Sequence, residues 1–494
     1  MKKLTKQSRI VLSELPPYQH GVLNASLAED IYSQSKNPAR ALHFLTALLI
    51  KDGWTNVQII NPIYHGKNGQ LTGQNFRDIY SSDALLFSTI TRTAPQTMQL
   101  VKKYHEINPG GIAIGGGPDP TFRKEKYLVD GMADIIFRGE ADRNLVTLME
   151  RLTLSPDDLS GIGGISYRSG SSIIDNEPEP LLSVEELGRV PHPFYDSETR
   201  RGVRTAPLET TRGCPNDCEF CSVTKFYGKK FRVKPIQWTL DELKNIDKMG
   251  RWIFYSSDNL TGNNHLPESR KTALEMLEAI AKSKYKRKGI AQVTIDVAEY
   301  PELVSALGKA GIDFLCIGIE SINPAALREM RKPYTAAQNI RNVKLLREAG
   351  RWNHGMMIIG FDADTPEIAE ATTEYAKESL DSWQPFAPTP NPGTDMYARL
   401  EREGRIITHD FSLYDGQHVV IRPKNFTPYA LQKTIFDGME DFYSKKEIAR
   451  RFVKSKHKLN ALGIGAYIHL FGGKRRMLYN PQTRAHLEFL RSVS

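Results

Sequence analysis

Three of the four cysteines in this chain of 494 residues stand close together, as Cys214, Cys218 and Cys221. Their spacing is C-x3-C-x2-C, and Phe220 immediately precedes the last of them. Soft thiolate ligands gathered in this way select iron–sulfur clusters, zinc or copper(I). Three ligands on a four-iron cube leave one iron without a protein ligand, which is typical of a catalytic cluster rather than one that only transfers electrons.

Zinc and a disulfide are the alternative interpretations of this segment. A structural zinc site takes four ligands, and the nearest histidines, His192 and His265, are distant in the sequence. Three neighbouring thiols leave one unpaired, and four cysteines in the whole chain do not form a secreted disulfide framework. We therefore favour one open [4Fe-4S] cluster. The fourth cysteine, Cys316, is expected in the core of an apolar strand and cannot hold a second cluster.

The motif C-x3-C-x-Phe-Cys resembles the signature of the radical S-adenosylmethionine (radical SAM) enzymes. In that superfamily the amino and carboxylate groups of S-adenosylmethionine (SAM) chelate the open iron. One electron from the cluster then yields a 5′-deoxyadenosyl radical, which abstracts a hydrogen atom. The resemblance implies that the cofactors include a [4Fe-4S] cluster and SAM, and that the electron donor is of the flavodoxin or ferredoxin type.

The elements that must position this motif are strands and helices that alternate over residues 201–395. Polar residues follow most of the expected strands, and active sites of (β/α) barrels lie at the carboxyl ends of the strands. Six strands suggest the partial (β/α)6 barrel of the radical SAM enzymes. The strands are expected at 205–211, 252–255, 291–295, 314–319, 356–361 and 383–386.

The resemblance places the SAM pocket at these strand ends. Ser257 and Asp258 are expected near the methionine amino group, Asp296 and Glu320 near the ribose and carboxylate, and Gly360 near the adenine. Taken singly, most of the carboxylates are explained better as helix N-caps. As a set beside the cysteine loop they predict a SAM-binding site.

Residues 1–152 also alternate short apolar strands with helices, which predicts an open, doubly wound, Rossmann-like α/β domain. Such sheets bind ligands beyond the carboxyl ends of their strands. Ordinary strand-to-helix turns are the alternative for any one of these strand ends, and no G-x-G-x-x-G dinucleotide fingerprint is present. The residues at the predicted strand ends are Ser88, Thr89, Gly115, Gly116, Gly117, Gly139 and Glu140.

The order Gly-Gly-Gly-Pro-x-Pro-Thr, helix, Ala-Asp-x-x-x-Arg-Gly-Glu resembles the cobalamin-binding domain that precedes many radical SAM barrels. The resemblance implies that the seven strand-end residues contact cobalamin. Many such domains carry Asp-x-His-x-x-Gly, whose histidine ligates cobalt. That motif does not occur here, and Asp119 stands where relatives often have histidine. We therefore expect cobalamin without a protein histidine beneath cobalt.

Residues 153–200 are expected as a linker, and residues 396–494 as a basic helical region. The segments 414–420 and 442–444 resemble the tail of a subgroup that includes hopanoid-lipid methylases. Basic residues flank an apolar stretch at 461–471, which could touch an anionic membrane surface. A solvated basic face is the alternative. The basic residues are Arg450, Arg451, Lys454, Lys456, Lys458, Lys474, Arg475 and Arg476.

The net charge of +9 and the pI of about 9.1 are compatible with acidic partners, although a scattered basic surface explains them as well. No motif for nucleic-acid recognition stands out, so no nucleic-acid partner is expected. No apolar run reaches the roughly 18 residues of a membrane span, and residues 1–7 lack the apolar core of a signal peptide. A cytoplasmic location is expected, because a cluster with free thiolates needs a reducing compartment.

Together these features predict a cobalamin-dependent radical SAM enzyme that methylates an unactivated carbon of a small molecule or lipid. An unactivated C–H bond resists polar chemistry, which is why a radical is needed. Within the same class, the alternative is an oxidative cyclase of the anaerobic magnesium-protoporphyrin type. From another class, the alternative is a non-catalytic cobalamin or iron–sulfur sensor.

Overall fold

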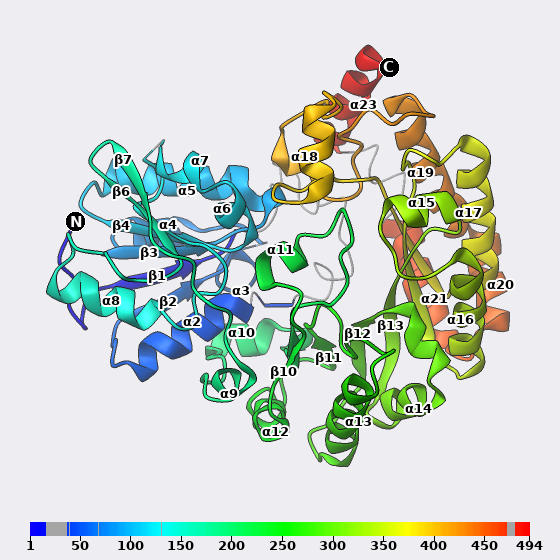
Figure 1. Cartoon of the computed structure of the whole chain (residues 1–494), viewed down its shortest axis with the longest axis horizontal. Helices are drawn as coiled ribbons and strands as arrows, with labels where there is room; N and C mark the ends of the chain where they lie inside the picture. The colour runs from blue at the N-terminus through cyan, green and yellow to red at the C-terminus, as the bar shows by residue number, and fades with distance from the viewer. Residues whose placement is uncertain (16–36, 39, 68, 130, 472–479) are drawn as a thin grey trace.

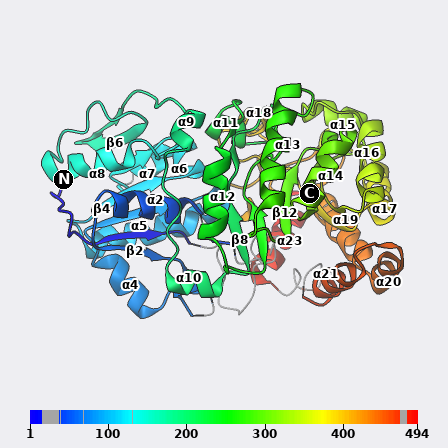
Figure 2. The ribbon, with the colours of Figure 1, turned by 90° about the horizontal axis from the view of Figure 1, so that it is seen from below.

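Two mainly parallel β-sheets lie side by side, one in each half of the molecule (Figure 1). The view from below shows the same division (Figure 2). This computed structural model describes residues 1–494 except 16–36, 39, 68, 130 and 472–479. The predicted class, α/β with two sheets and a helical C-terminal region, is confirmed.

The N-terminal sheet has seven strands in the order β2-β1-β3-β4-β5-β6-β7. The first five in this order are parallel, and their arrangement is that of the flavodoxin-like doubly wound fold. The last two pair antiparallel at one edge. The strands are β1 (Ile10–Ser13), β2 (Val57–Ile60), β3 (Ala84–Ser88), β4 (Ile112–Gly116), β5 (Ile135–Phe137), β6 (Ile165–Ser169) and β7 (Ser172–Asp175).

Helices cover both faces of this sheet. Successive side chains of a strand point to opposite faces, so each strand packs against both helical layers. In β1, Ile10 and Leu12 pack with α2 (Arg40–Lys51) and α8 (Leu145–Leu154). Val11 between them packs with the opposite layer, formed by α4 (Gly73–Tyr80), α5 (Ala94–Ile107) and α7 (Lys124–Leu128). The strands are therefore apolar on both sides, as a sheet between two helical layers requires.

The segment 153–200, which we expected as a linker, is only partly one. Its strands β6 and β7 complete the N-terminal sheet, and the buried Ile165 and Tyr167 join the core beneath α2 and α8. An antiparallel hairpin needs no crossover helix. The alternation of strands and helices, which predicted the rest of the sheet, therefore did not predict this hairpin. Only the chain after β7, with α9 (Val184–Leu187) and α10 (Ser197–Gly202), connects the two halves.

The second sheet has six parallel strands in the order β15-β14-β13-β12-β11-β8. These are β8 (Thr205–Leu208), β11 (Trp252–Tyr255), β12 (Gly289–Val293), β13 (Ile312–Glu320), β14 (Trp352–Ile358) and β15 (Ser382–Phe386). Each strand joins the next through a helical segment, which gives the predicted (β/α)6 arrangement. The main connecting helices are α12 (Ile236–Asn245), α13 (Pro267–Lys282), α14 (Pro301–Lys309), α16 (Ala336–Glu348) and α17 (Pro366–Ser379).

A short antiparallel ribbon interrupts the first connection, between β8 and α12. Its strands are β9 (Thr211–Arg212) and β10 (Arg232–Val233), and Arg212 pairs with Arg232. The 19 residues between them, 213–231, carry the three clustered cysteines and α11 (Val223–Tyr227). We call this segment the cysteine loop. The ribbon closes the loop at its base, so both ends of the loop start from one fixed point.

The C-terminal region is helical, as predicted, and packs against the barrel. Lys474, Arg475 and Arg476, part of the basic set expected near a membrane, lie outside the described residues. Among the helices that are described, none is both long enough and apolar enough to span a membrane. The main helices are α18 (Asp395–Arg402), α19 (Pro428–Phe442), α20 (Lys445–Lys454), α21 (Lys458–Phe471) and α23 (Pro481–Val493).

Candidate active site between the two sheets

A cavity of about 1220 Å³ lies between the two halves and is lined by residues of both. From the N-terminal half come residues that follow β1, β2, β3 and β4. From the other half come the cysteine loop, the carboxyl ends of the barrel strands and the segment 386–392. Pockets for a single small ligand usually measure roughly 300–1,000 Å³, so this cavity has room for more than one ligand.

The three clustered cysteines line this cavity and are partly buried. Sulfurs that share one tetrahedral zinc, with Zn–S bonds near 2.3 Å, would lie about 3.8 Å apart. Among the described residues, however, these cysteines do not form a group with all ligand atoms within 4.8 Å of one another. A wider spacing suits a cluster, in which each thiolate binds a different iron. Burial raises the pKa of all three thiols, that of Cys221 to about 12, so cluster binding must displace protons.

Backbone and side-chain contacts hold the cysteine loop from several directions. Gly213 has φ +86°, and a side chain there would meet the carbonyl oxygen of Lys230 at 2.6 Å. In the loop, the Glu219 amide donates to the carbonyl of Met330 (3.2 Å). The carboxylate of Glu219 accepts from Arg399 of α18 at 2.7 Å. The loop is therefore fixed to the barrel and to the C-terminal region before any metal binds.

Lys332 is the cation that faces the cysteines. Its ammonium lies 2.8 Å from Glu320 Oε1 and 5.5 Å from the centre of the Phe220 ring, and its charge acts to lower the pKa of the nearby Cys218 thiol. Burial acts to lower the pKa of Lys332, but the Glu320 carboxylate and the nearby Tyr334 outweigh it and hold that pKa well above its usual value. A fixed positive charge at this point complements anionic thiolates and the carboxylate of a ligand.

Two backbone turns with positive φ bring this pair together. Glu320 ends β13 at φ +61°, where the pairing with β14 shifts register. Helix α15 (Pro324–Glu329) ends with Arg331 at φ +57°, and the Lys332 amide donates to the Leu327 carbonyl at 2.9 Å. That is the Schellman pattern, usually completed by glycine. Non-glycine residues in this region store strain, and such strain concentrates at functional sites.

Asp258, Gln292, Thr294 and Tyr334 complete the barrel side of the cavity. Burial raises the pKa of Asp258 to about 6, and the nearby Glu209 adds to the effect. The Tyr334 hydroxyl is buried and has no hydrogen-bond partner among the described residues. A buried donor without a partner is costly, so this hydroxyl is available to a polar ligand in the cavity.

Of the five residues predicted for SAM, the structure brings Asp258 and Glu320 into the cavity wall, and Ser257, Asp296 and Gly360 are not part of it. Ser257 Oγ accepts from the Thr211 amide at 3.2 Å, so it supports the turn that enters the cysteine loop. Gly360 has φ +114° and lies against Leu431 of α19, where a Cβ would be 2.5 Å from a methyl group. Packing against Leu431 therefore explains why a glycine occupies position 360.

None of the seven residues predicted for cobalamin lines the cavity, although the residues that follow Thr89 and Gly117 do. Ser88 and Thr89 precede the lining segment 90–93, and Gly117 precedes Pro118. Gly115 packs beneath Phe87, where a Cβ would lie 2.5 Å from the ring. The last residues of a parallel strand still pack in the core. The residues of the first turn after the strand are therefore the ones that line the cavity. The cavity wall of the N-terminal half thus includes the turns after β3 and β4, and the assignment of the seven residues to cobalamin stays a prediction.

Glu140 and Asp119 also have roles that differ from those expected. The Glu140 carboxylate is buried and bonded to two arginines of the other half of the molecule. Asp119, the residue in place of a histidine, is fully buried and bonded to Arg123 and Tyr127 (2.7 and 2.6 Å). Among the described residues that line the cavity, none is a histidine.

Sequence reasoning missed Lys332, Tyr334 and Arg92, all of which line the cavity. Lys332 and Tyr334 follow a short helix after β13, and no metal or cofactor motif includes them. Arg92 lies three residues beyond the predicted Thr89, on the turn η1 (Thr91–Thr93). Arg92 could have been predicted from its place in the turn that follows β3. Lys332 is not part of any strand end or motif, so only the tertiary structure reveals it.

Comparison with known proteins matches residues 208–376 to the family described as the Radical SAM superfamily. An uncharacterised methyltransferase of Pyrococcus horikoshii is 26% identical over 76% of this chain and 82% of its own length. The anaerobic magnesium-protoporphyrin IX monomethyl ester cyclase of Cereibacter sphaeroides is also 26% identical, over 83% of this chain and 68% of its own.

A solved structure with a similar fold is that of OxsB, described as a cobalamin-dependent S-adenosylmethionine radical enzyme with aqua-cobalamin and S-adenosylmethionine bound. The match covers 98% of this chain and 75% of that one, with a TM-score of 0.66 and 18% sequence identity. At that identity the likeness concerns the fold, which extends over both halves of the molecule.

Proposed function

We propose that this chain, whose residues 208–376 match the Radical SAM superfamily, is a cobalamin-dependent enzyme that methylates an unactivated carbon. One observation carries the proposal: the three cysteine thiols and the carboxyl edge of the N-terminal sheet open into one cavity. A radical initiator in the barrel alone would not need that sheet. The names of the relatives and the ligands of the structural neighbour support the same reading.

The cofactors carry the chemistry, and the chain holds and shields them. When bound, the cluster and SAM supply a hydrogen-abstracting radical, and cobalamin supplies the methyl group. Cys214, Cys218 and Cys221 are proposed to hold three irons. Lys332 is proposed to bind the SAM carboxylate, and Asp258 its amino group. Apolar side chains of the wall exclude water, which limits quenching of reactive species; they include Ile90, Phe122, Met356, Ile358 and Phe386.

The substrate is proposed to be a small molecule or a lipid, and the electron donor a small acidic protein of the flavodoxin or ferredoxin type. The chain's net charge of +9 supports an acidic donor. A cytoplasmic location is proposed because an oxygen-sensitive open cluster needs a reducing compartment. No nucleic-acid partner is proposed.

Oxidative cyclisation is the second candidate, and the similarity to the magnesium-protoporphyrin cyclase favours it over other radical chemistry. The two reactions differ in their by-products. Methylation with regeneration of the methyl donor releases both 5′-deoxyadenosine and S-adenosylhomocysteine, whereas a cyclisation driven only by radical formation releases 5′-deoxyadenosine alone.

The first experiment is reductive cleavage of SAM by protein reconstituted anaerobically with iron and sulfide. We expect 5′-deoxyadenosine when dithionite is added, because the cysteine loop is preformed beside the cavity. Protein that holds a cluster and forms no 5′-deoxyadenosine would support the sensor alternative instead. Protein that cleaves SAM but binds no added hydroxocobalamin would refute the methylation proposal while leaving the radical enzyme intact.

The ligand assignment is tested by paired cysteine variants. Cys218→Ala should lose most of the cluster iron and all SAM cleavage, because two thiolates hold a four-iron cluster poorly. Cys316→Ala is the matched control: Cys316 of β13 also lines the cavity but lies outside the three-cysteine motif, so its loss should leave the iron content unchanged. Iron and sulfide analysis and the electron paramagnetic resonance spectrum of the reduced protein give the result. Equal iron in both variants would refute the assignment.

A further inference from the structure

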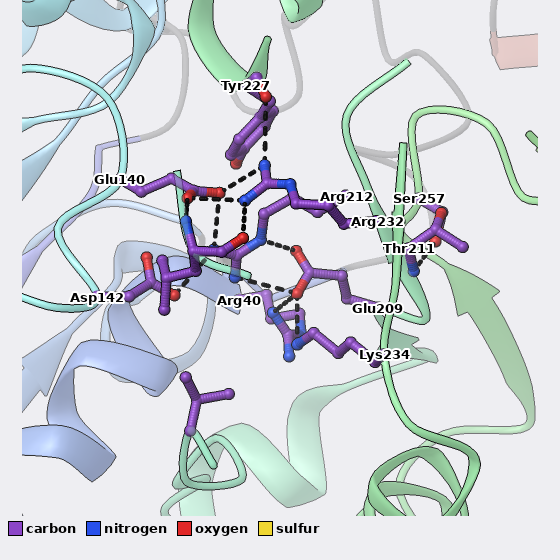
Figure 3. Close-up of polar contacts among 12 residues, drawn as sticks. Arg40, Glu140, Asp142, Glu209, Thr211, Arg212, Tyr227, Arg232, Lys234 and Ser257 are labelled. Atoms are coloured by element: carbon purple, nitrogen blue, oxygen red, sulfur yellow. Dashed lines mark hydrogen bonds and ion pairs between the residues drawn. The ribbon is translucent and has the colours of Figure 1, made fainter. Parts of the chain in front are cut away.

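Seven charged side chains form a buried network where the two halves of the molecule meet (Figure 3). We call this the interdomain ion network. One group comes from the N-terminal half, and the other surrounds the base of the cysteine loop. The first group is Arg40, Glu140 and Asp142, and the second is Glu209, Arg212, Arg232 and Lys234.

Arg212 lies at the centre of this network. Its guanidinium contacts Glu140 at 3.1 Å, Asp142 at 2.9 Å and Glu209 at 3.2 Å. Glu140 contacts Arg232 as well, at 2.9 Å. Because Glu140 and Asp142 belong to the N-terminal half, their contacts with Arg212 and Arg232 span the boundary between the halves, whereas the contact between Arg212 and Glu209 lies within the barrel half.

Glu209 is the second centre and is bonded to Arg40 at 2.9 Å and Lys234 at 2.6 Å. The side chains of Arg232 and Lys234 are fully buried, and that of Glu140 is 4% exposed. Burial acts to raise the pKa of Glu209, but the surrounding cations hold it well below its usual value. The carboxylate is therefore ionised at the domain boundary.

Buried ion pairs add little net stability, because desolvation of the charges offsets their attraction, and an apolar contact of the same size would serve as well. Their directional bonds instead select one relative placement of the groups they join. Here the charged groups of the network lie next to the two segments that wall the cavity, the cysteine loop and the carboxyl edge of the N-terminal sheet. Arg212 is two residues from Cys214, and Glu140 follows β5 and Gly139 at the carboxyl edge of the N-terminal sheet.

We propose that the interdomain ion network sets the distance between the cysteine loop and the N-terminal sheet, with Glu140 and Arg212 as positioning residues for the step that needs both halves. This inference rests on the proposed function, because methyl transfer from SAM to cobalamin requires ligands of the barrel and of the N-terminal sheet to meet. Radical formation from SAM requires only the barrel. Loosening the network should therefore uncouple the two reactions.

The test is Glu140→Gln in the full chain, which keeps the side chain's shape and removes one negative charge. Reconstituted protein is supplied with SAM and with cob(I)alamin generated by titanium(III) citrate. Methyl transfer to cobalamin leaves S-adenosylhomocysteine, and reductive cleavage leaves 5′-deoxyadenosine. Misplacement by about 1 Å can slow a reaction about a hundred-fold. We expect S-adenosylhomocysteine formation to fall by about ten- to a hundred-fold while 5′-deoxyadenosine formation stays near that of the unaltered protein.

Glu179→Gln is the matched control, because Glu179, on the chain just after β7, accepts hydrogen bonds from Arg143 and Asn144 of the N-terminal half and, among the described residues, has no hydrogen bond or ion pair with the barrel. Asp142→Asn is the milder second variant if Glu140→Gln fails to fold, since Asp142 makes one contact to Arg212. It should change the ratio of the two products in the same direction.

Hydrogen exchange of the cofactor-free protein gives a readout that does not depend on activity. Amide exchange should become faster in Glu140→Gln both at 138–144 and in the cysteine loop, because local opening follows the loss of the contacts. The proposal is overturned if both products fall together, if neither changes, or if the variant loses cobalamin from its absorption spectrum, which would make Glu140 a cobalamin ligand. Absence of S-adenosylhomocysteine from the unaltered protein would instead reject the proposed function.

Discussion

Lys332 illustrates how much of this site depends on single side chains with no sequence motif. It is the buried cation beside Glu320 and Cys218, and two positive-φ residues direct the chain so that it arrives there. An ammonium in this position neutralises Glu320 in the absence of ligand. If a ligand carboxylate replaced Glu320 as the partner of Lys332, the free-energy cost would be small, because one charge-assisted hydrogen bond replaces another.

Replacement of Lys332 by Gln should weaken SAM binding more than cluster binding. Loss of a bond to a charged group costs about 1.5–3 kcal/mol, so we expect the KM for SAM in the 5′-deoxyadenosine assay to rise about ten-fold or more. Lys225→Gln is the control, because Lys225 lies in the cysteine loop but pairs with Asp395 near the surface. An unchanged KM with normal iron content would exclude Lys332 from the SAM site.

At the scale of elements, some strand ends of the barrel line the cavity and others pack against the C-terminal region. Asp258 and Glu320 follow β11 and end β13 and line the cavity, whereas Gly360, after β14, lies against α19 of the C-terminal region. The C-terminal helices therefore complete the packing of the barrel.

Gly360→Ala should destabilise the protein without a direct effect on cofactor binding. The left-handed backbone conformation and the close approach of Leu431 each cost roughly 1–3 kcal/mol, so we expect the free energy of unfolding to fall by about 3 kcal/mol. Gly404→Ala separates the two causes, because Gly404 has φ +64° and no atom within 4 Å of its added Cβ. That control should lose only about 1 kcal/mol. Urea unfolding measures both, and equal losses would disprove the steric contribution.

At the scale of the whole molecule, three buried histidines among the described residues have a lowered pKa, and they lie in different parts of the chain. These are His43 in α2, His354 in β14 and His486 in α23, and burial lowers the pKa of each from 6.5 to about 4. Between pH 4 and 6.5 the unfolded chain therefore binds more protons than the folded one. Stability is full above pH 6.5 and is lost as the pH falls toward 4.

His354→Gln should reduce this acid sensitivity. His354 accounts for about 2 kcal/mol of the loss in unfolding free energy between pH 6.5 and 4.5, as its pKa shift implies. The variant can be less stable at both pH values, but its loss between them should be smaller by that amount. Denaturant titrations at the two pH values measure the difference. An identical pH dependence in the variant would show that His354 is not the neutral buried group described here.

Much of the architecture could be predicted from the sequence because parallel α/β folds repeat a simple local pattern. Apolar strands alternate with amphipathic helices, so the sheets and the barrel could be expected from the chain. The spacing of Cys214, Cys218 and Cys221 likewise depends only on the chain between them. The hairpin of β6 and β7 was missed because it breaks the alternation.

The sequence by itself determined the cysteine motif, the alternation of strands and helices within each half and the absence of a histidine motif for cobalt. Only the tertiary structure decided which side chains face the cavity. Strand-end residues such as Gly115 and Gly360 are held by packing, while Lys332 reaches the site through a turn. Glu140 and Arg212 are 72 residues apart, and their contact exists because two separately folded sheets meet. Local patterns specify elements, but contacts between distant elements follow from how their surfaces fit.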